Sequence, residues 1–593
     1  MLYCHVDERQ RCPAAASRCR LSQEAGGRMD SRYDFVIVGG GHNGMTLAAY
    51  LSKSGYSVCV LESRLEIGGA QENAEPRPGF RIDPHASVLY GGAAPGFEQL
   101  ELHKYGFRMS YWGQYGLAVT SDNRAFVGGN RWTFAEAAET LRPFSEKDAD
   151  LWGSMMGFIF PHLKDILRST FWTPPFPPEL EVEQTDLPWV KTWTEASGGA
   201  LPGNFFDASL VDVCDELFET GALKAVTGLG AWYSGAAPTW DGMAAQAFGS
   251  FLLASYGSGA PKGGMHTYAH AIARCALAHG ARVLVNCPVE EIIVRDGRAA
   301  GVILADDASA AGKTIWADKA VVSAVDVQQT FQRLVGPRHV DASFLQKIKD
   351  ISLKGGSLYV LHVVCKELPR YVGQAQELVE QVGYPGSVLY PCDDWDSVVA
   401  QMRDAYSRKT TPTGRASMTL PVLMPTTYDR SRAPDGYHVL SPIYIEVPPP
   451  EYHVGGPEAV NRQKEQITAE MLEMLRALAP NMTDSNIVDV YVNTPLDSEF
   501  RNAGLVGGNW YATRHCEDQW WTQRPLPELS RYRTPIDNLY LCNQTSFPGG
   551  LCLMAVPYNL MHILIDDGLV EPADWWYPSP WHITDAGTRI GAN

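Results

Sequence analysis

The sequence has few features of a protein built on disulfides or on a redox-active dithiol. Its 12 cysteines are scattered over 593 residues, and no two of them form a CxxC pair. A disulfide scaffold is normally shorter and denser in cysteine, and a dithiol reductase needs the paired motif. We therefore expect mostly reduced thiols in a cytoplasmic enzyme.

Long hydrophobic runs and excess positive charge are also missing. No apolar run reaches the ~18–20 residues that a membrane-spanning helix needs. The formal net charge of -18 argues against nucleic acid as a partner, because phosphate binding needs clustered Lys and Arg. Residues 1–30 lack the apolar centre of a signal peptide, and their charges and small residues predict a disordered extension. We identify no HxxxH, CxxC or carboxylate cluster that would indicate a metal site.

The clearest motif is "DFVIVGGGHNG", which begins at Asp34. The apolar run ending at Val38 is typical of a strand buried on both faces. A helix is predicted over Met45–Ser54, and a second strand is predicted over Tyr56–Leu61. Glu62 follows that strand. Strand, helix and strand together predict a βαβ unit that binds a dinucleotide.

Each glycine of this unit has a physical role. Gly39 makes the tight turn, Gly41 lets the backbone approach the pyrophosphate, and Gly44 lets the helix pack on the strand. The helix N-terminus offers free N–H groups to the phosphates. Glu62 lies 23 positions after Gly39, where an acidic side chain meets the ribose hydroxyls. The predicted cofactor-binding residues of this unit are Gly39, Gly41, His42, Asn43, Gly44, Glu62 and Ser63.

A second glycine pair follows the second strand at Gly68, Gly69 and Ala70. It resembles the second glycine signature of FAD-binding oxidases, which NAD-only domains do not usually carry. No second complete dinucleotide fingerprint is present, since "GSGAPKGG" at Gly257–Gly264 has no clean strand before it. We therefore expect one tightly bound dinucleotide, and FAD as that cofactor.

Four stretches in order resemble the phytoene-desaturase-like branch of the FAD-dependent amine oxidase superfamily. They are the opening fingerprint with "IGGAQENAE", the "PKGGMHTYAHAIARCALAHGARVLVNCPVEEIIVRDG" segment, "TTYDRSRAPDGYHVLSPI", and "RPLPELSRYRTPIDNLYLCNQTSFPGG". The resemblance runs from about Tyr33 to about Leu569. It implies an α/β fold, with a Rossmann-like FAD-binding domain assembled from discontinuous segments. It also implies an α+β substrate-binding domain with a mixed or antiparallel sheet.

The resemblance places further residues at the cofactor. Val289 corresponds to the residue whose backbone meets the adenine, and Ala324 ends a strand that approaches the dinucleotide. In the last segment, a final helix is expected to point its N-terminus at the flavin ring. That segment contributes Asn543, Pro548, Gly549 and Gly550. A helix N-terminus favours an anion, in agreement with the negative charge of a reduced flavin.

The sequence departs from the family pattern just after this segment. Leu551, Met554 and Pro557 occupy positions where glycines are expected, and Phe547 replaces a frequent histidine. The larger side chains should narrow the space beside the flavin. These changes leave FAD binding intact and indicate a specialised substrate, with a catalytically degenerate FAD protein as the alternative.

The expected organisation has seven parts: an extension at 1–30, FAD-binding segments at 31–110, 256–335 and 501–575, a substrate or cap region at 111–255, a substrate domain at 336–500, and a tail at 576–593. The cap region is rich in Trp, Phe and Pro. This composition favours an aromatic core under proline-rich loops, with a membrane-touching or substrate-gating surface as the alternative.

Four polar residues flank the flavin-facing segment and are the candidate catalytic residues: Tyr511, His515, Tyr558 and Asn559. Each could position substrate or carry a proton. The expected reaction is hydride transfer from a C–H bond of an apolar, terpenoid-like or carotenoid-like molecule to FAD, with oxygen or a quinone as electron acceptor. The alternatives are an amine or amino-acid oxidase, a redox-neutral double-bond isomerase, and a non-catalytic FAD-binding protein.

Overall fold

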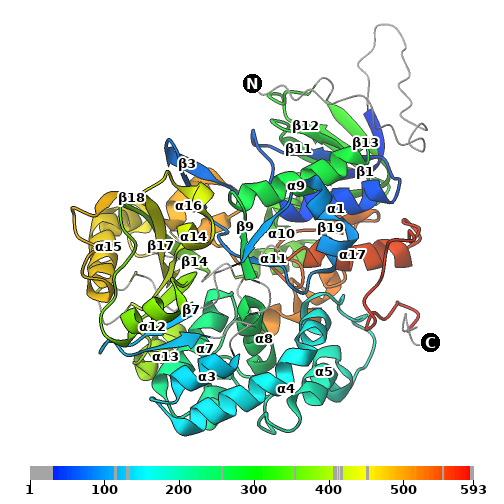
Figure 1. Cartoon of the computed structure of the whole chain (residues 1–593). Coiled ribbons are helices and arrows are strands. Elements are labelled where there is room, and N and C mark those ends of the chain that lie inside the picture. Colours follow the sequence, from blue (N-terminus) through cyan, green and yellow to red (C-terminus); the bar gives the residue numbers. More distant parts are fainter. Residues whose placement is uncertain are drawn as a thin grey trace.

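The computed structural model describes the chain from residue 31 to residue 587, apart from short gaps. The described residues are 31–111, 116–128, 134–255, 258–310, 313–352, 356–404, 410–411, 413–414, 418–448, 450, 453–513, 516–550 and 553–587. The extension expected at 1–30 and the candidate His515 lie outside this set. Figure 1 shows three regions: a sheet with helices at the upper right, a second sheet at the left, and a group of helices along the bottom.

The first sheet is assembled from three separated stretches of chain. Its order is β10-β2-β1-β13-β12-β11, and β19 pairs with β13. The strands are β1 (Ser31–Val38), β2 (Val58–Leu61), β10 (Arg282–Leu284), β11 (Val289–Arg295), β12 (Arg298–Leu304), β13 (Thr314–Ser323) and β19 (Leu539–Leu541). Strand β1 is parallel to both β2 and β13. The Rossmann-like domain built from discontinuous segments is thus confirmed.

Local sequence explains why these elements form. The last four residues of β1 are buried because the strand lies in the middle of the sheet. The hairpin of β11 and β12 turns at Asp296 and Gly297, which both have positive φ angles of 50° and 77°. This is the geometry that a two-residue hairpin turn requires. Three helices lie near one another beside the sheet: α1 (His42–Lys53), α9 (Met265–Ala278) and α17 (Ala555–Asp566).

The second sheet is mostly antiparallel and combines five strands of the expected substrate domain, 336–500, with two strands of the expected cap region, 111–255. Its order is β18-β14-β17-β16-β15-β7-β8, and among the described strands of this sheet only β15 and β7 pair in parallel. The strands are β7 (Gly116–Val119), β8 (Ala125–Gly128), β14 (Ser357–Cys365), β15 (Ser387–Tyr390), β16 (Leu420–Leu423), β17 (His438–Val447) and β18 (Ile487–Asn493). Helix α15 (Gly456–Leu478) packs its apolar side into the core of this sheet. The mixed sheet expected from the sequence is confirmed.

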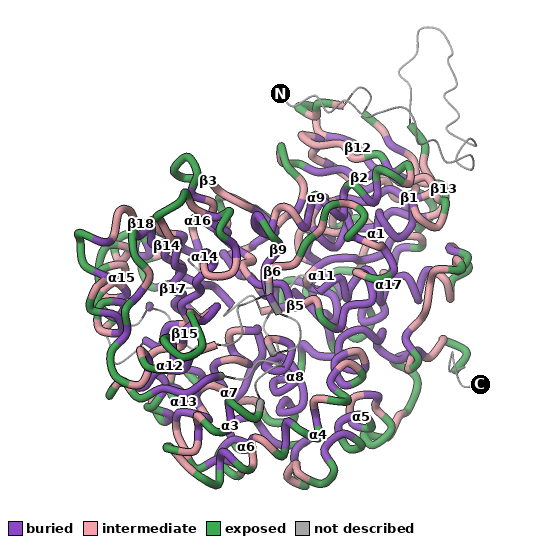
Figure 2. The backbone as a smooth tube through the Cα atoms, viewed as in Figure 1, coloured by how far each residue is buried: buried purple, intermediate pink, exposed green. Residues whose placement is uncertain are grey.

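The aromatic-rich stretch forms a helical region with a buried core. Its helices are α3 (Phe134–Leu141), α4 (Glu146–Phe171), α5 (Pro188–Ser197), α6 (Leu210–Leu217), α7 (Gly221–Tyr233) and α8 (Ala244–Ser255). Trp152, Trp172, Trp193 and Trp232 are each at most 2% exposed. Figure 2 shows the buried backbone concentrated inside this region. Burial of the tryptophans agrees with the interpretation of an aromatic core. Among the described residues, no helix is both long and apolar enough to cross a membrane.

Candidate functional site

The glycine turn between β1 and α1 has the geometry of a dinucleotide-binding loop. Gly39 has a φ of +106°, and its N–H donates to the Leu61 carbonyl at 2.8 Å. A methyl group on Gly44 would lie 2.2 Å from the Gly39 carbonyl oxygen, so the helix and the turn are in direct contact. A methyl group on Gly41, in contrast, would lie 3.9 Å from its nearest neighbour, the Gly69 Cα. The turn therefore leaves space at the one glycine where a pyrophosphate must approach.

Helix α1 begins at this turn without a side-chain cap. It starts at His42, and the N-cap residue, Gly41, has no side chain that could accept a hydrogen bond from the first turn. The first turn is nevertheless buried, with His42 and Asn43 at 7% and 5% exposed. Burial lowers the pKa of His42 to about 4, so the ring is neutral at pH 7. A buried, uncapped helix N-terminus fits an anionic ligand, because its first N–H groups have no partner within the helix.

Glu62 shapes the glycine loop through its carboxylate. Its Oε2 accepts from the Gly40 N–H at 2.8 Å, and its Oε1 accepts from the Arg64 N–H at 2.8 Å. The Ser63 hydroxyl donates to the same carboxylate at 3.2 Å. The side chain thus lies beside the turn, as a ribose-binding residue must. Its contact with a ribose remains a prediction.

The second glycine loop lies directly against the first. The Gly68 N–H donates to the Gly40 carbonyl at 2.8 Å, and a methyl group on Gly69 would lie 3.1 Å from the Gly41 Cα. Ala70 continues this loop, and the Gln71 side chain after it is fully buried. Neither polar atom of that amide has a hydrogen-bond partner among the described residues. An unsatisfied buried amide is costly, and a bound polar ligand would satisfy it.

Ala324 and Asn543 adjoin the fingerprint, whereas Val289 lies further along the sheet. The Ala324 N–H donates to the Val38 carbonyl at 2.8 Å, and its Cβ faces Gly44. Val289 begins β11 opposite Leu304. Asn543 follows β19, where its amide nitrogen donates to the Val325 carbonyl at 2.8 Å. The structure thus brings Ala324 and Asn543 to the carboxyl ends of parallel strands, where ligands bind in such sheets.

The segment predicted to face the flavin, residues 543–550, is called here the flavin-facing segment. It differs from the sequence expectation at its junction with the final helix. Pro548, Gly549 and Gly550 do not open directly onto that helix, which begins at Ala555. The residue before it, Met554, has a φ of +57°. Its side chain packs toward α2 (Pro95–Gln99), where a methyl group on Gly96 would lie 2.5 Å from the Met554 sulfur. Leu551 lies outside the described residues, and Pro557 is buried within α17.

Three of the four candidate catalytic residues are described, and each is buried with a hydrogen bond to a backbone carbonyl. The Tyr511 hydroxyl donates to Tyr233 at 2.7 Å, and the Tyr558 hydroxyl donates to Tyr577 at 3.1 Å. The Asn559 amide donates to the carbonyl of Phe171 at 3.2 Å. Burial raises the pKa of Tyr558, which keeps it protonated at neutral pH. Two of these contacts reach the helical region, at Tyr233 and Phe171, and the third reaches the C-terminal tail. Catalytic roles for the residues remain predictions.

Aromatic rings pack against the start of the flavin-facing segment. The Phe547 ring centroid lies 4.9 Å from that of Trp520 and 5.1 Å from that of Trp521. Trp189 of α5 lies 4.5 Å from Trp521. We call Phe547, Trp520, Trp521 and Trp189 the aromatic wall. It connects the segment to the apolar core of the helical region.

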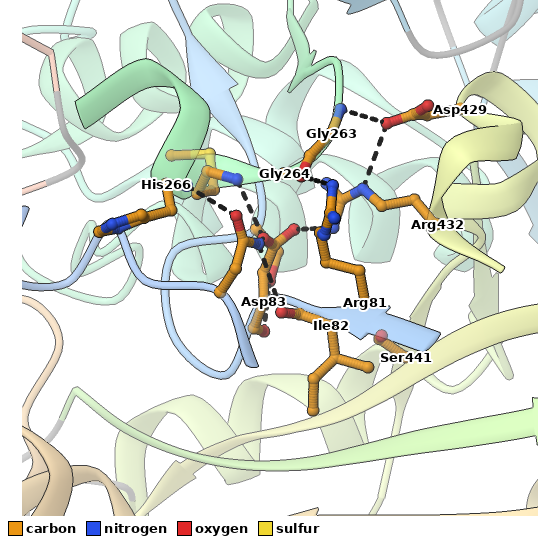
Figure 3. Close-up of polar contacts among 12 residues, drawn as sticks. Arg81, Ile82, Asp83, Gly263, Gly264, His266, Asp429, Arg432 and Ser441 are labelled. Atoms are coloured by element: carbon orange, nitrogen blue, oxygen red, sulfur yellow. Dashed lines mark hydrogen bonds and ion pairs between the residues drawn. The ribbon is translucent and has the colours of Figure 1, made fainter. Parts of the chain in front are cut away.

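Arg432, Asp83 and Asp429 form a buried ion cluster that the sequence interpretation missed. Arg432 lies in the short helix η6 (Arg430–Arg432) and is fully buried. Its Nη1 lies 2.6 Å from Asp83 Oδ2, and its Nε lies 3.3 Å from Asp429 Oδ2. Figure 3 shows that Asp429 also accepts from Gly263, at 2.7 Å. Two carboxylates thus surround one guanidinium.

The same cluster orients the start of α9. The Met265 N–H donates to Asp83 Oδ1 at 3.0 Å, and the His266 N–H donates to Asn73 Oδ1 at 3.0 Å. Arg81 donates to the Gly263 carbonyl at 3.1 Å (Figure 3). Helix α9 lies beside α1, and a methyl group on Gly68 would lie 2.9 Å from Ala269 of α9. The cluster therefore holds the start of a helix that packs against the second glycine loop. Only the charged residues within "FRID" and "YDRSRAP" could have signalled it.

The helix α9 carries an HxxxH pair that the sequence interpretation overlooked, His266 and His270. Their ring centroids lie 4.2 Å apart. The His266 Nδ1 lies 2.9 Å from the Gln71 carbonyl, and its Nε2 lies 3.5 Å from Glu66. Within the described ranges no group of three or more His, Cys, Asp or Glu side chains could hold a metal ion.

Two buried histidines, His362 and His85, make the stability of the protein depend on pH. Burial lowers the pKa of His362, on β14, to about 3, with Arg432 and Arg501 adding to the effect. Burial, Arg501 and Arg64 likewise lower the pKa of His85 to about 3. As the pH falls below 6.5, the unfolded chain binds protons that the folded chain does not, so stability falls. When the pH is lowered from 7.5 to 5.5, the two rings should together lower the free energy of unfolding by about 2–3 kcal/mol.

Urea unfolding at the two pH values measures how steeply the free energy of unfolding changes with pH, in wild type and in the His362→Asn variant. This change is called the slope. The variant should lose about half of the slope assigned to the pair. The His103→Asn variant, at an exposed position, serves as the matched control and should keep the full slope. An unchanged slope in His362→Asn contradicts the assignment.

Comparison with known proteins gives consistent matches over most of the chain. A family model described as flavin containing amine oxidoreductase matches residues 204–554. A model for an NAD(P)-binding Rossmann-like domain matches residues 37–100.

Three curated relatives align over nearly the whole chain. Pyridine nucleotide-disulfide oxidoreductase domain-containing protein 2 of Rattus norvegicus is 27% identical, covering 94% of this chain and 97% of that protein. A limonene dehydrogenase subunit of Castellaniella defragrans is 24% identical, covering 92% and 96%. Chloroplastic prolycopene isomerase of Daucus carota is 23% identical, covering 92% and 83%.

Solved structures share the fold. An oxidoreductase from Methanosarcina mazei has a TM-score of 0.54 at 16% identity, covering 90% of this chain and 99% of that one. Wild-type putrescine oxidase bound to putrescine has a TM-score of 0.54 at 16% identity, covering 91% and 100%.

Proposed function

The chain belongs to the family of flavin-containing amine oxidoreductases and is an FAD-dependent oxidoreductase, and we propose that it removes a hydride from a C–H bond of a mainly apolar small molecule to form a C=C bond. A proton leaves the adjacent carbon in the same overall reaction. Oxygen or a quinone then reoxidises the flavin. The substrate class that best fits is terpenoid or carotenoid-like.

The single observation that carries this proposal is the aromatic wall at the flavin-facing segment. Phe547 immediately precedes Pro548, and its ring packs on Trp520 and Trp521. An apolar surface continuous with the reacting site favours an apolar substrate, because burying apolar area is the main source of its binding energy. A diamine would need negatively charged partners at that position.

FAD fits the residues that surround the fingerprint. Gly39, Gly41, Gly44 and the start of α1 would hold the diphosphate, and Glu62 would hold the ribose. A bound dinucleotide would occupy the space beside Gly41 and could form hydrogen bonds with the unsatisfied Gln71 amide. When bound, the flavin supplies the acceptor for the hydride.

The chain's own residues exclude water and hold the site's shape. Tyr511 and Asn559 are tied to the helical region, and Tyr558 to the C-terminal tail, through hydrogen bonds to backbone carbonyls. Burial keeps Tyr558 neutral, so it can donate a hydrogen bond but does not act as a base at neutral pH.

The relatives support this class of chemistry. One is named as part of a limonene dehydrogenase, and it aligns over 92% of this chain. The alignment with a prolycopene isomerase over the same share favours a second candidate, which is redox-neutral double-bond isomerisation of an apolar polyene. That reaction needs the flavin to be reduced beforehand and transfers no net electrons.

The test is an absorbance spectrum of the purified protein, followed by anaerobic addition of terpenoids, polyenes, cyclic ketones and amines. We expect bound FAD whose visible bands bleach with a terpenoid or polyene and not with amines. Bleaching by amines alone overturns the desaturase proposal in favour of an amine oxidase. Isomerised product that forms only after prior reduction supports the isomerase. A chain that binds no flavin contradicts both.

A further inference from the structure

Arg524 is a fully buried arginine next to the flavin-facing segment. It follows the short helix η9 (Trp521–Gln523), and its side chain has no exposed surface. Burial lowers its pKa to about 9, which still leaves the guanidinium charged at pH 7. The molecule therefore holds a positive charge in its interior at this point.

The hydrogen-bond partners of Arg524 are all backbone carbonyls. Its Nη2 donates to Gln544 at 3.0 Å and to Tyr511 at 3.3 Å, and its Nη1 donates to Gln519 at 3.3 Å. Its Nε has no partner in the described part of the chain. Among the described residues, no carboxylate lies within 4.0 Å of the guanidinium.

The other deeply buried arginines are different. Arg432 contacts Asp83 and Asp429. Arg531, which is 5% exposed, contacts Asp566 at 3.4 Å and Asp585 at 3.0 Å. Each of these charges is compensated within the protein. A buried charge that no carboxylate compensates is strongly unfavourable, so Arg524 requires another explanation.

The position of Arg524 suggests where its counter-charge comes from. Gln544, which accepts one of its hydrogen bonds, lies five positions before Gly549 in the chain, and Tyr511 accepts another. A methyl group on Gly550 would lie 3.6 Å from the Tyr511 Cα. Tyr511 therefore contacts both Arg524 and a glycine that is expected to face the flavin.

We infer that Arg524 supplies the positive charge that stabilises the anionic, reduced form of the bound flavin. The inference rests on the proposed function. Hydride transfer brings two electrons and one proton to the neutral oxidised ring, which thereby becomes an anion. Because Arg524 carries a fixed charge in a low-dielectric interior, it favours that anion over the neutral ring without any movement. A charge near the ring is one of the means by which proteins tune a flavin.

Sulfite provides a probe that needs no substrate. Its sulfur lone pair adds to the flavin N5, and the resulting adduct carries a negative charge on the ring, as the reduced flavin does. Wild-type protein should form this adduct, with bleaching of the flavin band. The Arg524→Met variant, which keeps the side-chain length and removes the charge, should bind sulfite about tenfold or more weakly.

The midpoint potential of the bound FAD should change in the same direction. A tenfold loss of the preference for the reduced form lowers a two-electron potential by about 30 mV. The Arg524→Lys variant keeps the charge and loses the planar fork, so it should retain most of the sulfite affinity and the potential. The matched control is Arg533→Met, which removes a 29% exposed arginine paired with Asp567 and Asp585 and should change neither.

Failure of this inference is distinct from failure of the proposed function. If wild type binds no FAD, the proposed function is wrong. If Arg524→Met binds FAD with unchanged sulfite affinity and potential, or if Arg524→Lys loses as much as Arg524→Met, the charge has no role and Arg524 is structural. If Arg524→Met does not fold, the wild-type protein decides: a bound FAD that forms no sulfite adduct and has a potential no higher than that of free FAD overturns the inference.

Discussion

The Arg432→Met variant is expected to lose about 3–5 kcal/mol of unfolding free energy, because the substitution leaves two buried carboxylates without their cation. Asp83 is 6% exposed and Asp429 is 2% exposed, so water cannot replace the guanidinium. Burial opposes the charged form of Asp429. Hydrogen bonds from Ser431 and Gly263, together with Arg432, nevertheless lower the pKa of Asp429 below its ordinary value. Loss of Arg432 removes part of this stabilisation.

Urea-induced unfolding followed by tryptophan fluorescence measures the loss. The matched control is Arg430→Met, in the same short helix, where an exposed arginine forms a hydrogen bond with the His438 ring at 3.1 Å and has no ion pair among the described residues. That variant should lie within about 0.5 kcal/mol of wild type. An equal loss in the two variants contradicts the assignment of a buried ion cluster.

The cluster also bears on the site itself. Asp83 accepts from the Met265 N–H at the start of α9, and α9 supports the second glycine loop through Ala269 and Gly68. Any folded Arg432→Met protein should therefore bind FAD more weakly than wild type, although Arg432 is not placed at the cofactor. The coupling follows from the shared contacts of neighbouring residues.

The Gly44→Ala variant is expected to weaken FAD binding by about 10–100-fold. The added methyl group would lie 2.2 Å from the Gly39 carbonyl oxygen and 3.0 Å from the Ala324 Cβ. Because the first of these atoms belongs to the backbone, the helix and the turn must separate. Overpacking of this kind costs about 1–3 kcal/mol, which corresponds to that change in affinity.

Titration of the apoprotein with FAD, followed by quenching of flavin fluorescence, gives the affinity. The control substitution is Gly157→Ala in the interior of α4, where no atom lies within 4 Å of the added methyl group. It should leave the FAD affinity unchanged and raise stability by up to about 1 kcal/mol. A Gly44→Ala protein that binds FAD within twofold of wild type would mean that the turn adapts and the close contact has no consequence.

Features that depend on nearby residues were predictable. The β1–α1–β2 unit appears where the spacing of apolar residues and glycines predicted it. Both strands end at the predicted residues, Val38 and Leu61, and the other boundaries are shifted by a few residues. The turn at Asp296 and Gly297 and the buried helix α9 also follow from local sequence. The junction after Gly550 was predicted less well, because Met554 packs against Gly96, more than 400 positions earlier in the chain.

By itself, the sequence determined the dinucleotide-binding turn, the composite α/β fold and the acidic, aromatic-rich character of the chain. These properties depend on backbone sterics, on periodic burial and on composition, all of which act over a few residues. Only the tertiary structure decided which charges are buried and which have partners. Asp83 and Arg432 are 349 positions apart, and in the sequence both look like solvated surface residues. Arg524 differs from Arg432 only in what folding brings around it, since the free energy of a buried charge depends on its surroundings and not on its neighbours in the chain.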